Sequence, residues 1–350
     1  MNTVRIEASH SYDVHIGSGL LSNAGAYISR ICKKGKAAII SDSNVYPLYG
    51  ESLYENLMES GYQVITYTFS AGEESKNSDN LFQILNLLAE NEFTRTDLLI
   101  ALGGGVTGDI TGFAAAIYLR GISYIQIPTS LLAMVDSSVG GKTAIDLAAG
   151  KNLVGAFYQP KMVLCDLDVL QTLPQETFCD GCAEIIKYGI LYDEKLFDHL
   201  QENGLRFDRE YVIPRCIELK RDVVKADEFD KNERQKLNLG HTIGHGIEKQ
   251  SNYRISHGKS VAAGMAIVSK AAWKTGVCSH TVYDKICRIL KLFHLPTHTQ
   301  YNAAQLYSSA LSDKKRSGGT INLIVPVTIG NCILSPTHTE ELQSFIEAGL

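Results

Sequence analysis

Short apolar runs alternate with stretches of helical spacing through the first half of the chain. Residues 36–42 and 63–69 are strand candidates, and residues 77–90 carry leucine and isoleucine at helical intervals. Residues 97–102 form another apolar run that enters a glycine-rich turn, and residues 124–127 form one more before a proline. Strands that alternate with helices at this spacing predict a parallel sheet with helices on both faces.

The pattern changes near residue 170, after which helical spacing dominates. Helices are predicted over residues 182–191, 212–227, 238–249, 260–275 and 282–293. A strand is predicted only at residues 321–325. The fold class expected is therefore an α/β nucleotide-binding domain, residues 1–170, followed by an all-α domain, residues 171–350, with the boundary near Leu173-Pro174.

Composition narrows the class of protein. The 350 residues are 45% hydrophobic and 20% charged, with a formal net charge of −5. This mild acidity argues against nucleic acid or an anionic membrane as the main partner. The N-terminus alternates like a strand and lacks the pattern of a signal peptide. The most apolar stretch, residues 98–119, is interrupted by Asp109 and several glycines, which favours a buried strand, turn and helix over a membrane span.

Cysteine usage indicates a reducing compartment. The eight cysteines form no disulfide framework, so we expect a cytoplasmic protein. Cys179 and Cys182 have CxxC spacing, but a second such pair is absent, which favours two ordinary buried thiols. Gly141-Lys142-Thr143 looks like the end of a P-loop, yet Asp136 stands where the required glycine would be, which excludes that reading.

Gly103 to Gly108 fits the pattern G-x-G-x-x-G between a predicted strand and a predicted helix. Glycines let the backbone approach a pyrophosphate, and the helix N-terminus supplies free N–H groups. The usual acid about twenty residues downstream is absent, although Asp42 ends an earlier strand. Two interpretations stay open from the motif alone: a dinucleotide site and a tight turn without a ligand.

Residues 237–248 (LNLGHTIGHGIE) contain the most informative chemistry. His241 and His245 are four residues apart, so a helix presents both rings on one face, and His257 follows twelve residues later. Glu184 lies in an apolar, helical segment where a buried carboxylate needs a cationic partner, either Lys187 or a metal ion. Some of these three histidines and Glu184 suit a catalytic divalent ion, with Zn²⁺ favoured and Co²⁺ possible. A solvated helix face is the simpler alternative.

Several cationic residues fall in glycine-bearing or polar segments. They are Arg120, Lys142, Lys151, Lys187, Lys220, Arg234, Lys314 and Lys315. In a chain of negative net charge, their convergence would be local and would indicate a small polyanionic substrate, such as one with a phosphate and a carboxylate.

Taken in order, these segments resemble the 3-dehydroquinate synthase family across nearly the whole chain. The matching segments are residues 72–76 (GEESK), 102–109 (LGGGVTGD), 120–121 (RG), 127–143 (IPTSLLAMVDSSVGGKT), 150–153 (GKNL), 183–187 (AEIIK), 237–245 (LNLGHTIGH), 257–258 (HG) and 313–315 (DKK). Ser130 stands where the family often has threonine, which keeps the hydroxyl.

The resemblance implies two cofactors and assigns residues to each. It implies a divalent metal held by Glu184, His241 and His257, with His245 beside the ligands or moving a proton. For NAD it implies Asp42, Glu73, Lys76, Gly104, Gly105, Asp109, Thr129, Ser130, Asp136, Lys142 and Lys151. Around the substrate it implies Arg120, Lys142, Asn152, Lys187, Lys220, Arg234, Asn238 and Lys314, and leaves open whether Lys314 or Lys315 enters the site.

The activity implied is the conversion of 3-deoxy-D-arabino-heptulosonate 7-phosphate to 3-dehydroquinate and phosphate, in the shikimate pathway to aromatic amino acids. The resemblance also implies an active site in the interdomain cleft and a homodimer in which Arg120 acts across the interface. Alternatives are a 2-deoxy-scyllo-inosose or valiolone synthase, a metal-dependent polyol dehydrogenase, and an NAD-binding regulator without catalysis. Arg234 and Asn238 favour the first activity, because they suit a substrate carboxylate that the other sugar phosphates lack.

Overall fold

The computed structural model describes residues 1–312 and 319–350. These residues form two compact units. The N-terminal unit contains Met1–Pro174 and Cys216–Phe229, and the C-terminal unit contains Gln175–Arg215 and Asp230–Leu350. Helix α7 (Arg209–Ala226) therefore supplies residues to both units. Lys314 and Lys315 lie outside the described residues.

The N-terminal unit is built on a seven-stranded sheet with the order β1-β2-β9-β6-β5-β3-β4. Its strands are β1 (Asn2–Ile6), β2 (Tyr12–Gly17), β3 (Lys36–Asp42), β4 (Gln63–Phe69), β5 (Leu98–Gly103), β6 (Ser123–Pro128) and β9 (Met162–Asp166). Only the β1–β2 pair is antiparallel, and all the other pairs are parallel. The predicted parallel α/β sheet is confirmed.

The direction in which the sheet grows reverses between β3 and β5. The chain runs from β3 outward to β4 at the edge, and then returns to place β5 on the other side of β3. In open α/β sheets such a switch point leaves a crevice at the carboxyl ends of the two strands. Asp42 and Gly103 end β3 and β5, so the sheet topology places the predicted dinucleotide residues at this crevice.

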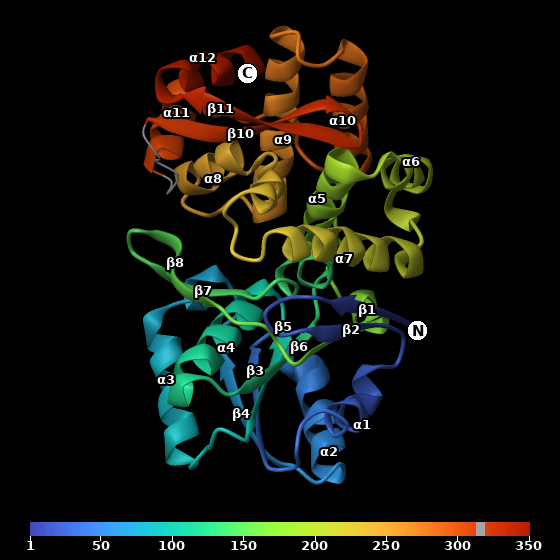
Figure 1. The fold of residues 1–350 in the computed structure, drawn as a ribbon, viewed down its shortest axis with the longest axis vertical. Helices are drawn as coiled ribbons and strands as arrows, with labels where there is room; N and C mark the ends of the chain where they lie inside the picture. The colour runs from blue at the N-terminus through green and yellow to red at the C-terminus, as the bar shows by residue number, and fades with distance from the viewer. Residues whose placement is uncertain (313–318) are drawn as a thin grey trace. The chain divides into compact units, whose positions relative to one another are not determined.

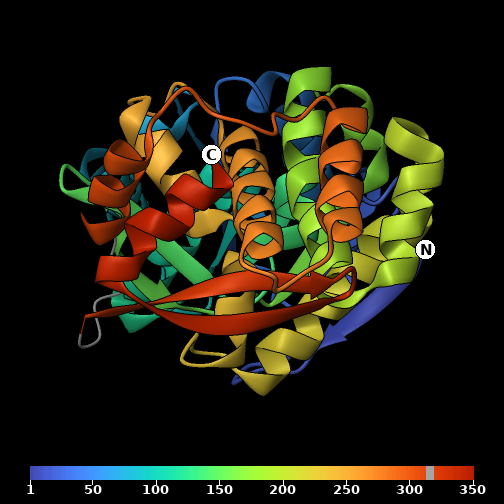
Figure 2. The ribbon, with the colours of Figure 1, turned by 90° about the horizontal axis from the view of Figure 1, so that it is seen from above.

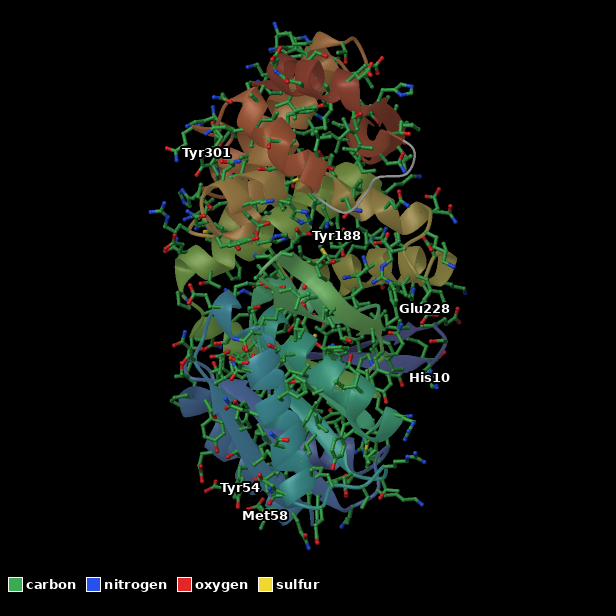
Figure 3. All side chains as sticks on the ribbon, turned by 90° about the vertical axis from the view of Figure 1, so that its left-hand side faces the viewer. His10, Tyr54, Met58, Tyr188, Glu228 and Tyr301 are labelled. Atoms are coloured by element: carbon green, nitrogen blue, oxygen red, sulfur yellow. The ribbon has the colours of Figure 1, made fainter. Side chains whose placement is uncertain are left out.

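Helices cover the sheet on both faces (Figure 1). On one face, α3 (Ser78–Glu90) and α4 (Gly105–Ile117) enclose a core of apolar strand residues such as Ile40 and Leu99. The other face carries α1 (Ala24–Ile28) and α2 (Glu51–Glu59), whose outer side bears the exposed Met58 (Figure 3). Short 3₁₀ and π turns complete the unit: η1 (Leu21–Asn23), η2 (Tyr46–Gly50), η3 (Glu73–Ser75), η4 (Tyr118–Arg120), η5 (Ala133–Ser137) and η6 (Leu167–Gln171).

A hairpin formed by β7 (Lys142–Leu147) and β8 (Gly150–Phe157) was not expected from the sequence. Most of β8 is exposed, so it lacks the apolar run that marks the central strands. Gly141-Lys142-Thr143 leads into β7 and not into a helix, in agreement with the exclusion of a P-loop.

The segment after residue 215 packs within the N-terminal unit through polar contacts. The backbone N–H and the hydroxyl of Ser9 donate hydrogen bonds to the Glu228 carboxylate at 2.8 and 2.6 Å. Figure 3 labels Glu228 beside His10, the residue that follows Ser9. The side-chain amide of Gln159 also donates to Glu228, at 2.8 Å. Sequence patterns gave no sign that part of α7 belongs with the sheet.

The C-terminal unit is helical, as predicted. Its helices besides α7 are α5 (Gln175–Tyr192), α6 (Glu194–Asn203), α8 (His241–Gln250), α9 (His257–Lys274), α10 (His280–Leu292), α11 (Ala303–Ser312) and α12 (Thr339–Gly349), with 3₁₀ turns η7 (Gly204–Arg206) and η8 (Glu233–Asn238). An antiparallel ribbon, β10 (Thr320–Thr328) with β11 (Asn331–His338), adds to the expected all-α fold. Figure 2 shows this ribbon in red, running past the orange helices.

The helix predicted over residues 238–249 begins three residues later in the structure. The turn η8 ends at Asn238, and α8 begins only at His241. Gly240 separates the two with φ of 77°, a left-handed conformation that a side chain disfavours. The break makes His241 the first residue of α8, and therefore sets where its ring lies.

All eight cysteines are free thiols, and both Cys179 and Cys182 are buried, as predicted. Burial raises the pKa of Cys179, so its thiol is protonated and unreactive at neutral pH. Among the described residues, no helix has the length and apolar character needed to cross a membrane.

Candidate active site

Three side chains from three helices gather inside the C-terminal unit. Glu184 lies in the middle of α5, His241 begins α8 and His257 begins α9. One ligand atom from each lies within 4.8 Å of the other two. Glu184 Oε1 is 3.6 Å from His241 Nε2 and 3.4 Å from His257 Nε2. Ligand atoms around a tetrahedral zinc ion are about 3.3 Å apart, so the cluster already has the spacing of a metal site.

Glycines allow α8 and α9 to approach closely enough for this geometry. A Cβ on Gly240 would lie 2.6 Å from the Val261 carbonyl oxygen, and one on Gly264 would lie 2.1 Å from the Gly240 carbonyl oxygen. A Cβ on Gly244 would also press on the α9 backbone, at 3.1 Å. The group that these glycines admit is the backbone of α9.

The chemistry of the donor set suits a divalent cation. The Glu184 side chain is fully buried, and its second oxygen forms an ion pair with Lys187, which is 1% exposed. The Nδ1 of His241 lies 3.0 Å from the Leu239 carbonyl oxygen, which favours a proton on Nδ1 and leaves Nε2 to bind a metal. One carboxylate and two imidazoles leave a coordination position open, as catalytic zinc sites do.

The two histidines have opposite pKa shifts. Burial, helped by the Lys187 charge, lowers the pKa of His241 well below its ordinary value, so this ring is neutral. Burial also acts to lower the pKa of His257, but Glu184 and Glu248 outweigh it and raise this pKa to about 10. A metal that binds Nε2 of His257 must therefore displace a proton.

Glu248 was not predicted from the sequence. It is buried on α8, and its Oε1 lies 3.6 Å from His257 Nδ1, the nitrogen that faces away from Glu184. His245, Glu248 and His257 form a second group whose ligand atoms lie within 4.8 Å of one another. The available signal was the spacing of His241, His245 and Glu248 at i, i+4 and i+7, which shares one helix face.

The predicted dinucleotide residues of the N-terminal unit lie at the switch point. Thr107, in the first turn of α4, donates a hydrogen bond of 3.4 Å to Asp42 Oδ2, so the ends of β3 and β5 are neighbours. Gly103 is required by packing, since a Cβ would lie 2.4 Å from Thr107 Oγ1 and 2.7 Å from Thr107 Cβ. A Cβ on Gly108 would lie 2.6 Å from Gln126 Oε1, the end of a side chain that can turn away. A Cβ on Gly104 would meet nothing nearer than 3.5 Å, so the backbone at the α4 N-terminus is open to a ligand.

Residues that follow β6 lie at the same carboxyl edge of the sheet as the glycine turn. The Thr129 backbone N–H donates to the Gly103 carbonyl oxygen at 2.9 Å, and Ser130 Oγ accepts from the Ala133 N–H at 3.3 Å. A Cβ on Gly105 would lie 3.2 Å from Ser137 Oγ, so this glycine is also closely packed.

A charged cluster adjoins the glycine turn through α4. The buried Lys76 Nζ lies 2.8 Å from Asp109 Oδ2 and 3.6 Å from Glu73 Oε1, and Lys151 Nζ lies 3.6 Å from the same Glu73 oxygen. Burial acts to lower the pKa of Lys76, but Asp109 and Glu73 overcome this and raise it, so the ammonium stays charged. Asp146, also missed from the sequence, accepts from the Asn152 N–H at 2.7 Å and donates its own N–H to the Lys76 carbonyl at 2.8 Å.

The remaining predicted substrate residues fall into three groups. Lys220 of α7 is buried and contacts Asp136 twice at 2.6 Å, once at the carboxylate and once at the carbonyl. Arg234 is 2% exposed in η8, which also holds Asn238, whose amide donates to the Gln235 carbonyl at 2.9 Å. Arg120, Lys142 and Asn152 are exposed or partly exposed at the surface of the N-terminal unit.

Comparison with known proteins decides the family. Models of the 3-dehydroquinate synthase N-terminal and C-terminal regions match residues 66–180 and 181–316. The 3-dehydroquinate synthase of Clostridium acetobutylicum is 44% identical over 99% of both chains. The chain belongs to the 3-dehydroquinate synthase family.

Solved structures of related cyclases share its fold. A 2-deoxy-scyllo-inosose synthase complexed with carbaglucose-6-phosphate, NAD⁺ and Co²⁺ is 25% identical, with a TM-score of 0.90 over the whole of both chains. A 2-epi-5-epi-valiolone synthase from Streptomyces hygroscopicus, with NAD⁺ and Zn²⁺ bound, is 26% identical, also with a TM-score of 0.90, over 99% of this chain and 97% of that one. Membership of the 3-dehydroquinate synthase family thus agrees with the two sites described above.

Proposed function

We propose that this chain converts 3-deoxy-D-arabino-heptulosonate 7-phosphate to 3-dehydroquinate and phosphate. The observation that carries the proposal is the convergence of Glu184, His241 and His257 at metal-site spacing, in a chain 44% identical to a 3-dehydroquinate synthase. The rival cyclases among the solved structures are 25% and 26% identical, so they account for the fold better than for the substrate.

NAD and a divalent ion, Zn²⁺ or Co²⁺, are the cofactors of this proposal. Glu184, His241 and His257 would hold the ion, and the switch-point residues with Lys76 and Lys151 would hold NAD. When bound, NAD supplies a reversible hydride acceptor and the ion a Lewis acid for the substrate hydroxyl. As a reversible acceptor, NAD would not be consumed and would act catalytically.

The chain's own cations bind and orient the substrate. Lys187, Lys220 and Arg234 are buried, where their attraction for phosphate and carboxylate oxygens is least screened by water. The fork of the Arg234 guanidinium suits the carboxylate that glucose 6-phosphate lacks, and Asn238 lies one helical turn further along the chain. His245, whose ring lies beside those of His241 and His257, would move a proton. Lys314, the remaining predicted substrate residue, lies outside the described part of the chain.

Phosphate release tests the proposal directly. Purified protein with the heptulosonate substrate and trace NAD⁺ should release phosphate without accumulating NADH, and a chelator should stop the release. Glucose 6-phosphate and sedoheptulose 7-phosphate should release none; release from either would favour the inosose-type or valiolone-type alternative. Stoichiometric NADH from a polyol would indicate a dehydrogenase, and NAD binding without turnover of any substrate would indicate a regulator.

Glu248 is expected to support metal binding by orienting His257. We expect Glu248→Gln to weaken Zn²⁺ binding about 10- to 100-fold, because an amide is a poorer acceptor for the imidazole N–H than a carboxylate. Competition with a chromophoric chelator measures this change. Glu202→Gln, at an exposed position of α6, is the matched control and should bind Zn²⁺ like the wild type. Equal affinities in the two variants would show that Glu248 does not support the ligand.

Four further inferences belong to this proposal. We infer a homodimer in which the exposed Arg120 reaches the partner's substrate, a cytoplasmic location, and no role for nucleic acid or membrane. The division into a cofactor domain, residues 1–170, and a metal and substrate domain, residues 171–350, also stays a prediction. Analytical ultracentrifugation tests whether the chain is a dimer. Mixing the Arg120→Ala variant with a variant inactivated at Glu184 tests whether the site is shared, because a shared site restores activity in the mixed dimer.

A further inference from the structure

The first turn of α9 carries His257 but is not capped by its own N-cap residue. Ser256, at that position, makes no side-chain hydrogen bond to the turn. A helix N-terminus leaves its first N–H groups without intrahelical partners. The Lys259 N–H, at the third helical position, instead donates to Asp180 Oδ1 on α5 at 2.9 Å. The Ser256 hydroxyl donates to the same oxygen. The cap of α9 thus comes from another helix.

Asp180 belongs to a row of three carboxylates on α5. Glu176, Asp180 and Glu184 are spaced four residues apart, so they lie on one helix face. Each meets the first turn of α9. Glu176 forms an ion pair with the Lys259 ammonium, Asp180 accepts from the Lys259 N–H, and Glu184 Oε1 lies 3.4 Å from His257 Nε2. The row follows the first turn of α9 along α5. Because the Glu176 pair is largely exposed, the hydrogen bonds of Asp180 are the contacts that fix this turn.

Gly258 shows how closely the two helices meet. A Cβ at this position would lie 2.0 Å from the Asp180 carbonyl oxygen. Only glycine allows this approach without a shift of the backbone. Residue 258 stands between the metal-ligand candidate His257 and the capped Lys259, so any displacement here moves the His257 ring relative to Glu184.

We propose that Asp180 is a positioning residue for the metal site: by capping α9 from α5, it sets the separation of Glu184 and His257. The proposal rests on the proposed function only in taking this pair as metal ligands. His257 is the first residue of α9, so an uncapped and frayed turn removes a ligand. The apparent metal affinity then falls in proportion to the fraction of molecules with the turn formed.

The test compares Zn²⁺ affinities of the full chain, freed of metal and titrated against a chromophoric chelator. Asp180→Ala should bind Zn²⁺ about 10-fold more weakly, within the range seen for residues that orient metal ligands. Asp180→Asn should stay within about twofold of the wild type, because asparagine caps helices about as well as aspartate. Ser256→Ala, at an exposed position, removes one donor to Asp180 but leaves the Lys259 N–H contact, so it should show a smaller loss than Asp180→Ala.

Asp193→Ala is the matched control. Asp193 caps α6 in the same unit by accepting from the Leu196 N–H at 3.0 Å, and α6 carries no metal-ligand candidate. This variant should melt at a lower temperature with an unchanged Zn²⁺ dissociation constant. The d–d absorption bands of bound Co²⁺ should shift in Asp180→Ala and not in Asp193→Ala.

Three outcomes would overturn the proposal: Zn²⁺ binding by Asp180→Ala within twofold of the wild type, Asp180→Asn as weak as Asp180→Ala, or Asp193→Ala as weak as both. If Asp180→Ala does not fold, Ser256→Ala and Asp180→Asn decide the question. If the wild-type chain binds Zn²⁺ but releases no phosphate from any sugar phosphate, the proposed function is refuted. The Zn²⁺ affinities of the variants still test the role of Asp180 in that case.

Discussion

Replacing Glu184 by glutamine should remove bound metal and phosphate release together. The glutamine amide keeps the size of the side chain but loses the negative charge that faces His241, His257 and Lys187 inside the C-terminal unit. A neutral amide oxygen is a much weaker ligand for Zn²⁺ than a carboxylate. Since a Lewis-acid ion contributes several kcal/mol to the chemical step, we expect the rate to fall by at least about 10³-fold. Metal content by mass spectrometry and the phosphate-release rate check both parts.

Glu176→Gln is the matched control on the same helix. Glu176 is largely exposed, and an exposed ion pair such as the one with Lys259 contributes little to stability. This variant should keep its metal and a rate within about twofold of the wild type, given that small contribution. If Glu184→Gln also kept full activity, Glu184 could not be a metal ligand, and the proposed metal site would be wrong.

The parts of the fold that the sequence predicted are those with a strong periodic pattern. Strand β3 coincides with the predicted residues 36–42, because a parallel strand covered on both faces reads as a continuous apolar run. The edge strand β4 coincides with residues 63–69, which are rich in β-branched and aromatic residues. The β7–β8 hairpin and strand β11 were missed. Most of β8 is exposed and β11 contains Pro336, so neither has the pattern of a buried strand.

The candidate site was predictable where its residues share a helix or a motif. His241 and His245 lie on one face of α8, as their spacing indicated. Motif spacing could not show that α5 brings Glu184 to His257, because that contact depends on helix packing. Asp180 was missed because its role is a hydrogen bond to a backbone N–H of another helix, and any residue supplies a backbone N–H. The family resemblance identified Glu184 and His257 as metal ligands. Spacing alone left these two residues among several candidates.

The second large effect is expected at Lys76, in the N-terminal unit. Lys76 is 4% exposed, and its ammonium lies between Asp109 and Glu73. Lys76→Met leaves Asp109 without the ammonium 2.8 Å from it, while Glu73 keeps Lys151 at 3.6 Å. Breaking a buried ion pair in this way costs about 3–5 kcal/mol, so the free energy of unfolding should fall by that amount. Urea unfolding with and without NAD⁺ measures the change.

The pH dependence of that effect follows from the raised pKa of Lys76. Burial acts to lower it, but Asp109 and Glu73 raise it above the ordinary value of 10.5, so Lys76 stabilises the folded state fully below pH 10.5 and loses this effect only above it. The difference in unfolding free energy between the wild type and Lys76→Met should therefore be constant from pH 7 to pH 9. A difference that shrank across this range would show that Lys76 loses its proton near neutral pH.

The Lys151→Met variant distinguishes an effect on stability from an effect on cofactor binding. Lys151 is partly exposed, and its ammonium lies 3.6 Å from the outer carboxylate, Glu73. Its loss should change the unfolding free energy by less than about 1 kcal/mol. Both lysines are proposed to contact NAD, and a charge-assisted hydrogen bond is worth about 1.5–3 kcal/mol, so each variant should bind NAD⁺ about 10-fold or more weakly by calorimetry. Weaker NAD⁺ binding in Lys76→Met alone would mean that Lys76 supports the glycine turn through Asp109 and α4, while Lys151 serves only the surface hairpin.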